Sequence, residues 1–136
     1  MRLNPGIQGE ETVAQWLQQQ GAMILHRRWH CRWGELDLIV QWQEELVFVE
    51  VKTRSAGNWD QNGLGAISSR KQEKLRCAAE LFLAESPEFG EWGCRFDVAL
   101  VYYQRVGTCS DVRAIAPPLT YNHQQFMIID YLQGAF

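Results

Sequence analysis

The chain has 136 residues, a formal net charge of −3 from 13 basic and 16 acidic side chains, and a pI of about 5.6. Its length fits one domain spanning residues 1–136, and a content of 46% hydrophobic and 21% charged residues is typical of globular proteins. The acidic balance argues against a strong non-specific nucleic-acid binder, which is normally basic overall. No run approaches the ~18 apolar residues of a membrane span, and the N-terminus carries no apolar signal core, so we expect a cytoplasmic protein.

Periodicity predicts the first elements of the chain. Apolar residues at helical spacing predict a helix over residues 7–20, which Gly21 ends. Glu10 lies near the inward stripe of this helix, where it either interacts with the helix dipole or points at a site formed by other elements. Strands are then predicted over residues 22–31, 35–41 and 46–53.

The remainder of the chain predicts a loop, a helix and further strands. Residues 55–65 are polar and glycine-rich without periodicity, which is typical of a lid or a substrate-contacting loop. A second helix is predicted over residues 68–83, a strand over 95–103 and a short edge strand over 111–116. Residues 126–129 fit either a strand or a helical turn. The order α-β-β-β-α-β-β predicts an α/β domain in which two helices flank a mixed sheet.

The hairpin predicted from residues 35–53 carries the most informative pattern. A turn centred between Gln43 and Glu44 places Asp37 opposite Glu50, on one face of the sheet. The same register places Glu35 opposite Lys52 on that face. Ile39, Leu46 and Phe48 lie on it near the turn, so the acids and the lysine collect at the end away from the turn. The other face is apolar, with Leu36, Leu38, Val40, Val47, Val49 and Val51.

The connection between the two strands decides this register. Gln43-Glu44 is a poor sequence for a two-residue primed turn, so a four-residue connection from Trp42 to Glu45 is favoured, with the register unchanged. An odd-length loop would shift the pairing and separate Asp37 from Glu50.

A cluster of carboxylates on one hairpin face needs a physical reason. Carboxylates on adjacent positions repel one another, and a strand is an unfavourable place for aspartate. A hard divalent cation such as Mg²⁺ resolves the conflict, because it prefers carboxylate oxygens, water and phosphate oxygens as ligands. The alternative is a solvated face on which Glu35 and Lys52 form a cross-strand pair worth ~0.5 kcal/mol. The apolar opposite face favours the first interpretation.

These residues resemble a known superfamily. Glu10, Asp37 and the run Glu50-Val51-Lys52 are similar to the motif of PD-(D/E)xK nucleases, which include Holliday-junction resolvases and many restriction endonucleases. The chain resembles the YraN-like family of bacterial proteins more closely. The segments that carry this resemblance are Gly9-Glu10, Gly34 to Ile39, Val47 to Arg54, Lys71, Arg95 to Val98 and Ala135-Phe136. It departs from the family at Arg28-Trp29-His30, where Asn-x-Arg is frequent, and at Gly134, where Asn is frequent.

The resemblance implies a restriction-endonuclease-like fold and a metal-dependent phosphodiesterase acting on DNA, with branched DNA among its substrates. Asp37 and Glu50 would bind Mg²⁺ or Mn²⁺, and the Val51 carbonyl and Glu10 would be further ligands. Lys52 would orient the attacking water or stabilise charge on the phosphate. Backbone phosphates would be contacted by basic residues, namely Arg27, Arg28, Arg32, Arg54, Lys71, Lys74 and Arg76.

Two other classes of function stay open. In one, the fold binds nucleic acid or a protein partner without cleavage, which the acidic pI favours. In the other, the carboxylate cluster is a structural ion network, and its removal changes only stability. A structural salt bridge between Arg95 and Asp97 is as consistent with the sequence as a functional role. A homodimer is compatible with the resemblance, because resolvase-like enzymes are typically dimers, although the sequence identifies no interface.

Overall fold

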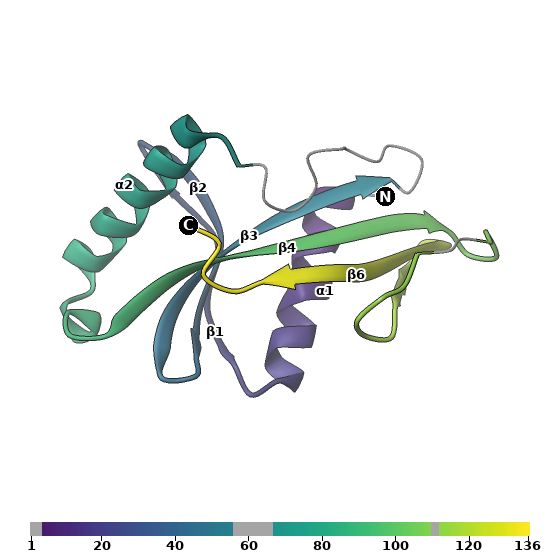
Figure 1. Cartoon of the computed structure of the whole chain (residues 1–136), viewed down its shortest axis with the longest axis horizontal. Helices are drawn as coiled ribbons and strands as arrows, with labels where there is room; N and C mark the ends of the chain where they lie inside the picture. Colours follow the sequence, from purple (N-terminus) through teal and green to yellow (C-terminus); the bar gives the residue numbers. More distant parts are fainter. Residues whose placement is uncertain (1–3, 56–66, 110–111) are drawn as a thin grey trace.

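The computed structural model describes residues 4–55, 67–109 and 112–136. Its elements, in chain order, are α1 (Pro5–Gln19), β1 (Met23–Cys31), β2 (Gly34–Trp42), β3 (Glu45–Ser55), α2 (Ser69–Glu85), the 3-10 turn η1 (Pro87–Phe89), β4 (Gly93–Arg105), β5 (Leu119–Tyr121) and β6 (Gln124–Leu132). Within these ranges the strands form one six-stranded sheet in the order β1-β2-β3-β4-β6-β5 (Figure 1).

The sheet is mixed, as the sequence predicts. Strands β3 and β4 are parallel and are joined through α2, whereas every other neighbouring pair is antiparallel. Two consecutive strands that run parallel need such a crossover, because a tight turn can join only antiparallel strands. The predicted α/β, restriction-endonuclease-like architecture is confirmed.

Each face of the sheet is covered by a helix. Helix α1 packs behind β3, β4 and β6, while α2 lies at the other end of the sheet over β2 (Figure 1). The core under α1 contains Val13, Ala14, Leu17, Leu38, Val40, Val47 and Val49. The core under α2 contains Leu36, Ile39, Leu46, Phe48, Leu75, Ala78, Ala79 and Phe82.

The predicted division of the hairpin residues between two faces differs from the structure at Leu36. Ile39, Leu46 and Phe48 are buried under α2, and Leu36 joins them rather than the residues under α1. The charged side chains lie beyond this second core, at the open end of the hairpin. A crossover helix that packs on the sheet needs an apolar face of its own, which is why both faces are buried.

Capping and one close contact position α1. The side chain of Asn4 accepts hydrogen bonds from the backbone N–H groups of Gly6 and Ile7, and Pro5 occupies the first turn. Gly9 lies against Thr53 of β3, and a Cβ at position 9 would collide with the threonine side chain. Glycine at this position therefore allows the helix to approach β3 closely, and it brings Glu10 next to the hairpin.

The β2–β3 register is confirmed, but the predicted four-residue connection is wrong. Leu38 pairs with Val49, and Trp42 pairs with Glu45 directly before the turn. Gln43 and Glu44 form a two-residue turn in which φ is 55° and 63°. Positive φ at both positions matches a type I′ turn, whose twist agrees with that of the strands. The requirement for matching twist outweighs the preference for Asn-Gly in this hairpin.

The C-terminal strands differ from the prediction. The described part of residues 111–116 contains no strand, and the edge strand β5 begins after Pro117-Pro118 instead. Asn122 and His123, with φ of 48° and 64°, turn β5 into β6, which contains residues 126–129. Proline cannot donate a ladder hydrogen bond, which accounts for the start of β5 after the pair.

Two further predictions concern the loop after β3 and the absence of a membrane span. The lid or substrate-contacting loop is predicted over residues 55–65; Ser55 is the last residue of β3, and the other ten lie outside the described residues. Neither α1 nor α2, nor any other helix of the described ranges, is long and apolar enough to cross a membrane.

Candidate metal and nucleic-acid site

The hairpin opens into a fork at the end away from its turn. The ladder between β2 and β3 stops at Leu38 and Val49, one pair before Asp37 and Glu50. Beyond this point the Asp37 carboxylate takes the place of a backbone partner, since its Oδ2 accepts the N–H of Val51 at 2.8 Å. We call this region, formed by Glu10, Glu35, Asp37, Glu50 and Val51, the fork.

Three acidic side chains converge in the fork. Carboxylate oxygens of Glu10 from α1 and of Glu35 and Asp37 from β2 lie within 4.8 Å of one another. Among the described residues, no other group of His, Cys, Asp and Glu side chains has such metal-binding spacing. Glu10 and Asp37 belong to the predicted ligand set, whereas Glu35 does not, although its position two residues before Asp37 was a usable signal.

The protonation of these acids reflects their crowding. Burial, together with the charges of Glu50, Glu10 and Glu35, raises the pKa of Asp37 to about 8, and the hydrogen bond from Val51 opposes this rise. Burial also raises the pKa of Glu10, against the lowering effect of Arg28. Without a cation the fork therefore holds more carboxyl groups than it can ionise near neutral pH. Mg²⁺ or Mn²⁺ would fit this set of hard oxygen donors and would favour the ionised forms.

Arg28 partly compensates the fork from an unusual backbone position. Its Nη1 lies 3.3 Å from Glu10 Oε1, so the side chain predicted to contact phosphate pairs with a predicted ligand instead. Arg28 has φ of 50° and interrupts the ladder of β1 with β2 between the pairs at Arg27 and Trp29. Such a conformation costs about 1–2 kcal/mol for a non-glycine residue, so the surrounding structure must hold it there.

Glu50 forms an ion pair with a lysine of α2, whereas Glu10 pairs with Arg28. The Glu50 side chain is 10% exposed, and Lys71 Nζ from α2 lies 2.7 Å from its Oε1. Lys52 follows Glu50 by two residues on β3, and strand alternation places both side chains on the same face. The structure thus gathers Glu10, Asp37, Glu50 and Lys52 around one end of the hairpin, while their catalytic and metal-binding roles stay predictions.

An open pocket of about 380 Å³ adjoins the fork. Its lining combines the β1–β2 turn with the start of α2 and consists of Trp33, Gly34, Glu35, Ser68, Arg70, Lys71, Lys74 and Leu75. Lys71 and Lys74 are among the predicted nucleic-acid contacts, whereas Arg70 and Trp33 are not. Arg70 lies in a basic run and Trp33 in polar company, and both signals were visible in the sequence.

The other predicted basic contacts have partners elsewhere. Arg27 pairs with Glu11 at 3.2 Å, and Arg54 Nη1 donates to the Thr53 carbonyl at 2.9 Å. The guanidinium of Arg76 lies 5.6 Å from the centre of the Phe136 ring. Arg32 is 5.2 Å from the ring of Trp33 and so reaches the edge of the pocket. The structure therefore brings only part of the predicted basic set to the fork.

Arg95 and Asp97 form a separate buried network at the turn end of the hairpin. Asp97 is fully buried and accepts hydrogen bonds from Arg95 Nε at 3.0 Å, Tyr131 Oη at 2.7 Å and the Gly134 N–H at 2.9 Å. Arg95 Nη1 also binds Glu45 Oε1 at 2.8 Å. We call this set the Arg95 network. Of the two roles left open by the sequence, the structure shows the salt bridge.

Comparison with known proteins identifies the family. The profile described as uncharacterised protein family UPF0102 matches residues 9–101. The chain belongs to this family. A UPF0102 protein of Nostoc sp. is 48% identical over 98% of this chain and 94% of its own length, and one of Synechococcus sp. is 49% identical over 98% and 91%. A third, from Synechocystis sp., is 54% identical over 73% of this chain and 67% of its own length.

Membership of UPF0102 confirms the resemblance drawn from the sequence. UPF0102 is the YraN-like family, which belongs to the PD-(D/E)xK-like nuclease superfamily. The profile covers Glu10, the whole β2–β3 hairpin and Lys71, and therefore all of the acids in the fork. The family places the chain among nuclease-like proteins.

Proposed function

We propose that this UPF0102 protein is a metal-dependent phosphodiesterase that cleaves DNA and that uses Mg²⁺ or Mn²⁺ at the fork. The observation that carries the proposal is the state of Asp37. Its carboxyl group accepts the Val51 N–H, yet its burial and the surrounding carboxylates raise its pKa to about 8. A structure that keeps an acid in such surroundings is best explained by a cation that the acid binds.

In this proposal each fork residue has a defined role. Asp37 and Glu50 would hold the cation, with Glu10 and the Val51 carbonyl as further ligands. Glu35 would be another donor, because its carboxylate lies within 4.8 Å of those of Glu10 and Asp37. The bound metal would stabilise charge on the phosphate and lower the pKa of its water. Lys52 orients that water or contacts a phosphate oxygen. Lys71 holds Glu50 through the 2.7 Å ion pair, and it would be available to contact a phosphate if Glu50 bound the cation.

A binding module without catalysis is the second candidate. Arg28 and Lys71 already pair with Glu10 and Glu50, so two fixed cations offset part of the negative charge of the fork. A protein that used these pairs only to hold its fold could bind nucleic acid or a protein partner through the neighbouring pocket. It would then need no divalent metal, and this difference separates the two candidates.

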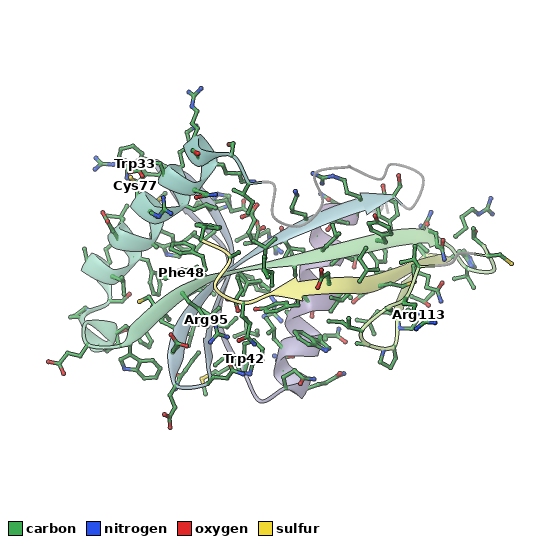
Figure 2. The ribbon with its side chains drawn as sticks, in the orientation of Figure 1. Trp33, Trp42, Phe48, Cys77, Arg95 and Arg113 are labelled. Carbon is green, nitrogen blue, oxygen red and sulfur yellow. The ribbon has the colours of Figure 1, made fainter. Side chains whose placement is uncertain are left out.

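The test is a cleavage assay with matched variants. Wild type, Asp37→Asn and Arg113→Ala are incubated with four-way-junction, single-stranded and duplex DNA in Mg²⁺, in Mn²⁺ and in EDTA. Asn keeps the acceptor for Val51 but removes the charge, and Arg113 is an exposed residue at the far end of the molecule (Figure 2). We expect wild type and Arg113→Ala to cleave only with metal, and Asp37→Asn to be at least about 100-fold slower.

The opposite result supports the binding module. If wild type and Asp37→Asn bind DNA equally and neither cleaves any substrate with either metal, the fork is not catalytic. The predicted homodimer is checked on the same samples by sedimentation.

A further inference from the structure

We propose that the pocket beside the fork holds an unpaired nucleotide of a single-stranded nucleic-acid segment, with its base stacked on Trp33 and its phosphates on Arg70 and Lys74. This inference rests on the proposed function and specifies its substrate: a strand with unpaired nucleotides next to the phosphate that is cut. We refer to this part of the surface, lined by Trp33, Glu35, Arg70, Lys71 and Lys74, as the Trp33 pocket.

Trp33 offers the first observation. It lies in the turn between β1 and β2 and is 40% exposed, although a tryptophan gains more from burial than most residues. The guanidinium of Arg32 lies 5.2 Å from the centre of its ring, which holds the ring as a flat platform at the pocket wall. Exposed aromatic rings beside cations are the feature by which proteins stack the bases of single strands.

The charge of the pocket is the second observation. Arg70, Lys71 and Lys74 project from the first turns of α2, where spacings of three and four residues place them on one side of the helix. Lys71 is engaged by Glu50, but no ion pair among the described residues involves Arg70 or Lys74. In a chain with a net charge of −3, this local cluster of cations is suited to binding phosphate.

Continuity with the fork is the third observation. Glu35 lines the Trp33 pocket and also belongs to the acids that converge on Asp37. Lys71 lines the pocket and pairs with Glu50. A nucleotide in the pocket therefore lies next to a phosphate bound over the fork.

These contacts determine whether the bound nucleotide can be base-paired. A base inside a duplex is stacked on both faces and cannot offer one of them to Trp33. Only an unpaired base can enter, from a single strand, a branch point or a nucleotide turned out of a helix. Stacking and phosphate contacts accept DNA and RNA alike, so the sugar is left to the experiment.

The test measures binding without cleavage. Fluorescence anisotropy follows the binding of a labelled oligothymidylate of about 12 nucleotides, an oligouridylate and a duplex of the same length, with Ca²⁺ in place of Mg²⁺. The variants are Trp33→Leu, Trp33→Phe, and Arg70→Ala combined with Lys74→Ala, and Arg113→Ala serves as the control on the far side (Figure 2). Thermal melting shows that each variant is folded.

We expect Trp33→Leu to weaken binding of the single strands by about fivefold or more, while Trp33→Phe keeps most of it. The double variant of Arg70 and Lys74 should weaken binding and reduce its salt dependence, because fewer counterions are released. Arg113→Ala should match wild type, and duplex binding should not respond to position 33.

Two outcomes would overturn the inference. The first is equal single-strand binding by wild type and Trp33→Leu. The second is displacement of the labelled single strand by polyglutamate to the same extent from wild type and from Trp33→Leu. This result would indicate an acidic protein partner. The binding experiment measures no cleavage, so it tests the Trp33 pocket even if the protein proves to have no nuclease activity. If the protein cleaves DNA but its binding does not depend on Trp33, the proposal for the pocket is wrong and the proposed function stands.

Discussion

The two ends of the β2–β3 hairpin bury acidic residues in opposite ways. At the turn end, Asp97 accepts hydrogen bonds from Arg95, from Tyr131 and from the Gly134 N–H. At the fork, Asp37 accepts a hydrogen bond from the Val51 N–H and faces three other carboxylates. One acid is surrounded by donors and the other by acids.

The pKa values follow this difference. Burial acts to lower the pKa of Arg95, but the hydrogen bonds and charges of Asp97 and Glu45 raise it overall. At the fork, burial and like charges act in the same direction and raise the pKa of Asp37. A buried acid that is paired with an arginine maintains the fold, whereas a buried acid that faces other acids is ready for a cation. Burial by itself therefore does not distinguish a structural acid from a functional one. The groups around the acid make the distinction.

The largest expected effect is at the turn end. Asp97→Asn leaves the buried Arg95 with Glu45 as its remaining ionic partner, and we expect the free energy of unfolding to fall by about 3–5 kcal/mol. Urea denaturation measures this change. Asp130→Asn, an exposed acid on β6, is the matched control and should change little. A loss below about 1 kcal/mol at Asp97 would break the contrast between the two ends.

Removal of the acid at the fork should raise the free energy of unfolding at high pH, whereas removal of Asp97 lowers it. The pKa of Asp37 is about 8 in the folded protein and 3.8 in the unfolded chain, so the folded state binds the proton more tightly. Its contribution to stability is fully present below pH 4 and is lost as the pH rises to about 8, with a slope of up to ~1.4 kcal/mol per pH unit. Without metal, Asp37→Asn should flatten this decline and be the more stable protein at pH 8.

Denaturation of both proteins across this pH range, with Asp130→Asn as control, checks the sign. A steeper decline in Asp37→Asn than in wild type would show that the fork is already compensated. Addition of Mg²⁺ should stabilise wild type more at pH 8 than at pH 5, since the cation binds the ionised carboxylate.

A backbone change can move the fork without touching its charges. Gly9→Ala should lower the free energy of unfolding by about 1–3 kcal/mol, because the new Cβ collides with Thr53. Helix propensity alone predicts a gain of ~1 kcal/mol. Denaturation of Gly9→Ala, Thr53→Ala and the double variant forms a cycle in which Thr53→Ala should recover most of the loss. Additive effects would show that α1 does not depend on this contact to place Glu10.

The smallest effect is expected at the turn that joins the two ends. Replacing Gln43-Glu44 with Asn-Gly should raise the free energy of unfolding by about 1 kcal/mol, because both residues have positive φ. Thermal melting measures the gain. Metal binding at the fork should not change, and a change in it would show that the turn and the fork are coupled.

The hairpin was the most predictable part of the fold. Alternation and a centred turn were sufficient for the β2–β3 register from Leu38 to Trp42. The turn type was not predictable, because the twist of the strands prevailed over the residue preference at Gln43 and Glu44. The position of β5 was missed: residues 112–116 form no strand, although the Ile115 N–H donates to the Ile128 carbonyl, and β5 begins only after Pro117-Pro118.

The site was predictable in its acids and less so in its cations. Glu10, Asp37 and Glu50 come together because the strands and α1 fix them. The ends of long basic side chains depend on tertiary partners, and so Arg28 turned to Glu10 and Lys71 to Glu50. The separation of the strands after Leu38 could not be read from alternation, since it results from Asp37 replacing a backbone acceptor.

The most direct test of the central claim is calorimetric titration of Mn²⁺ into wild type and Asp37→Asn near neutral pH, in two buffers with different ionisation enthalpies. If the fork is a metal site, wild type binds Mn²⁺ with release of protons from Asp37, whose pKa is about 8, and the variant loses both the binding and the proton release. Absence of binding to wild type, or equal binding by both proteins, would contradict the account.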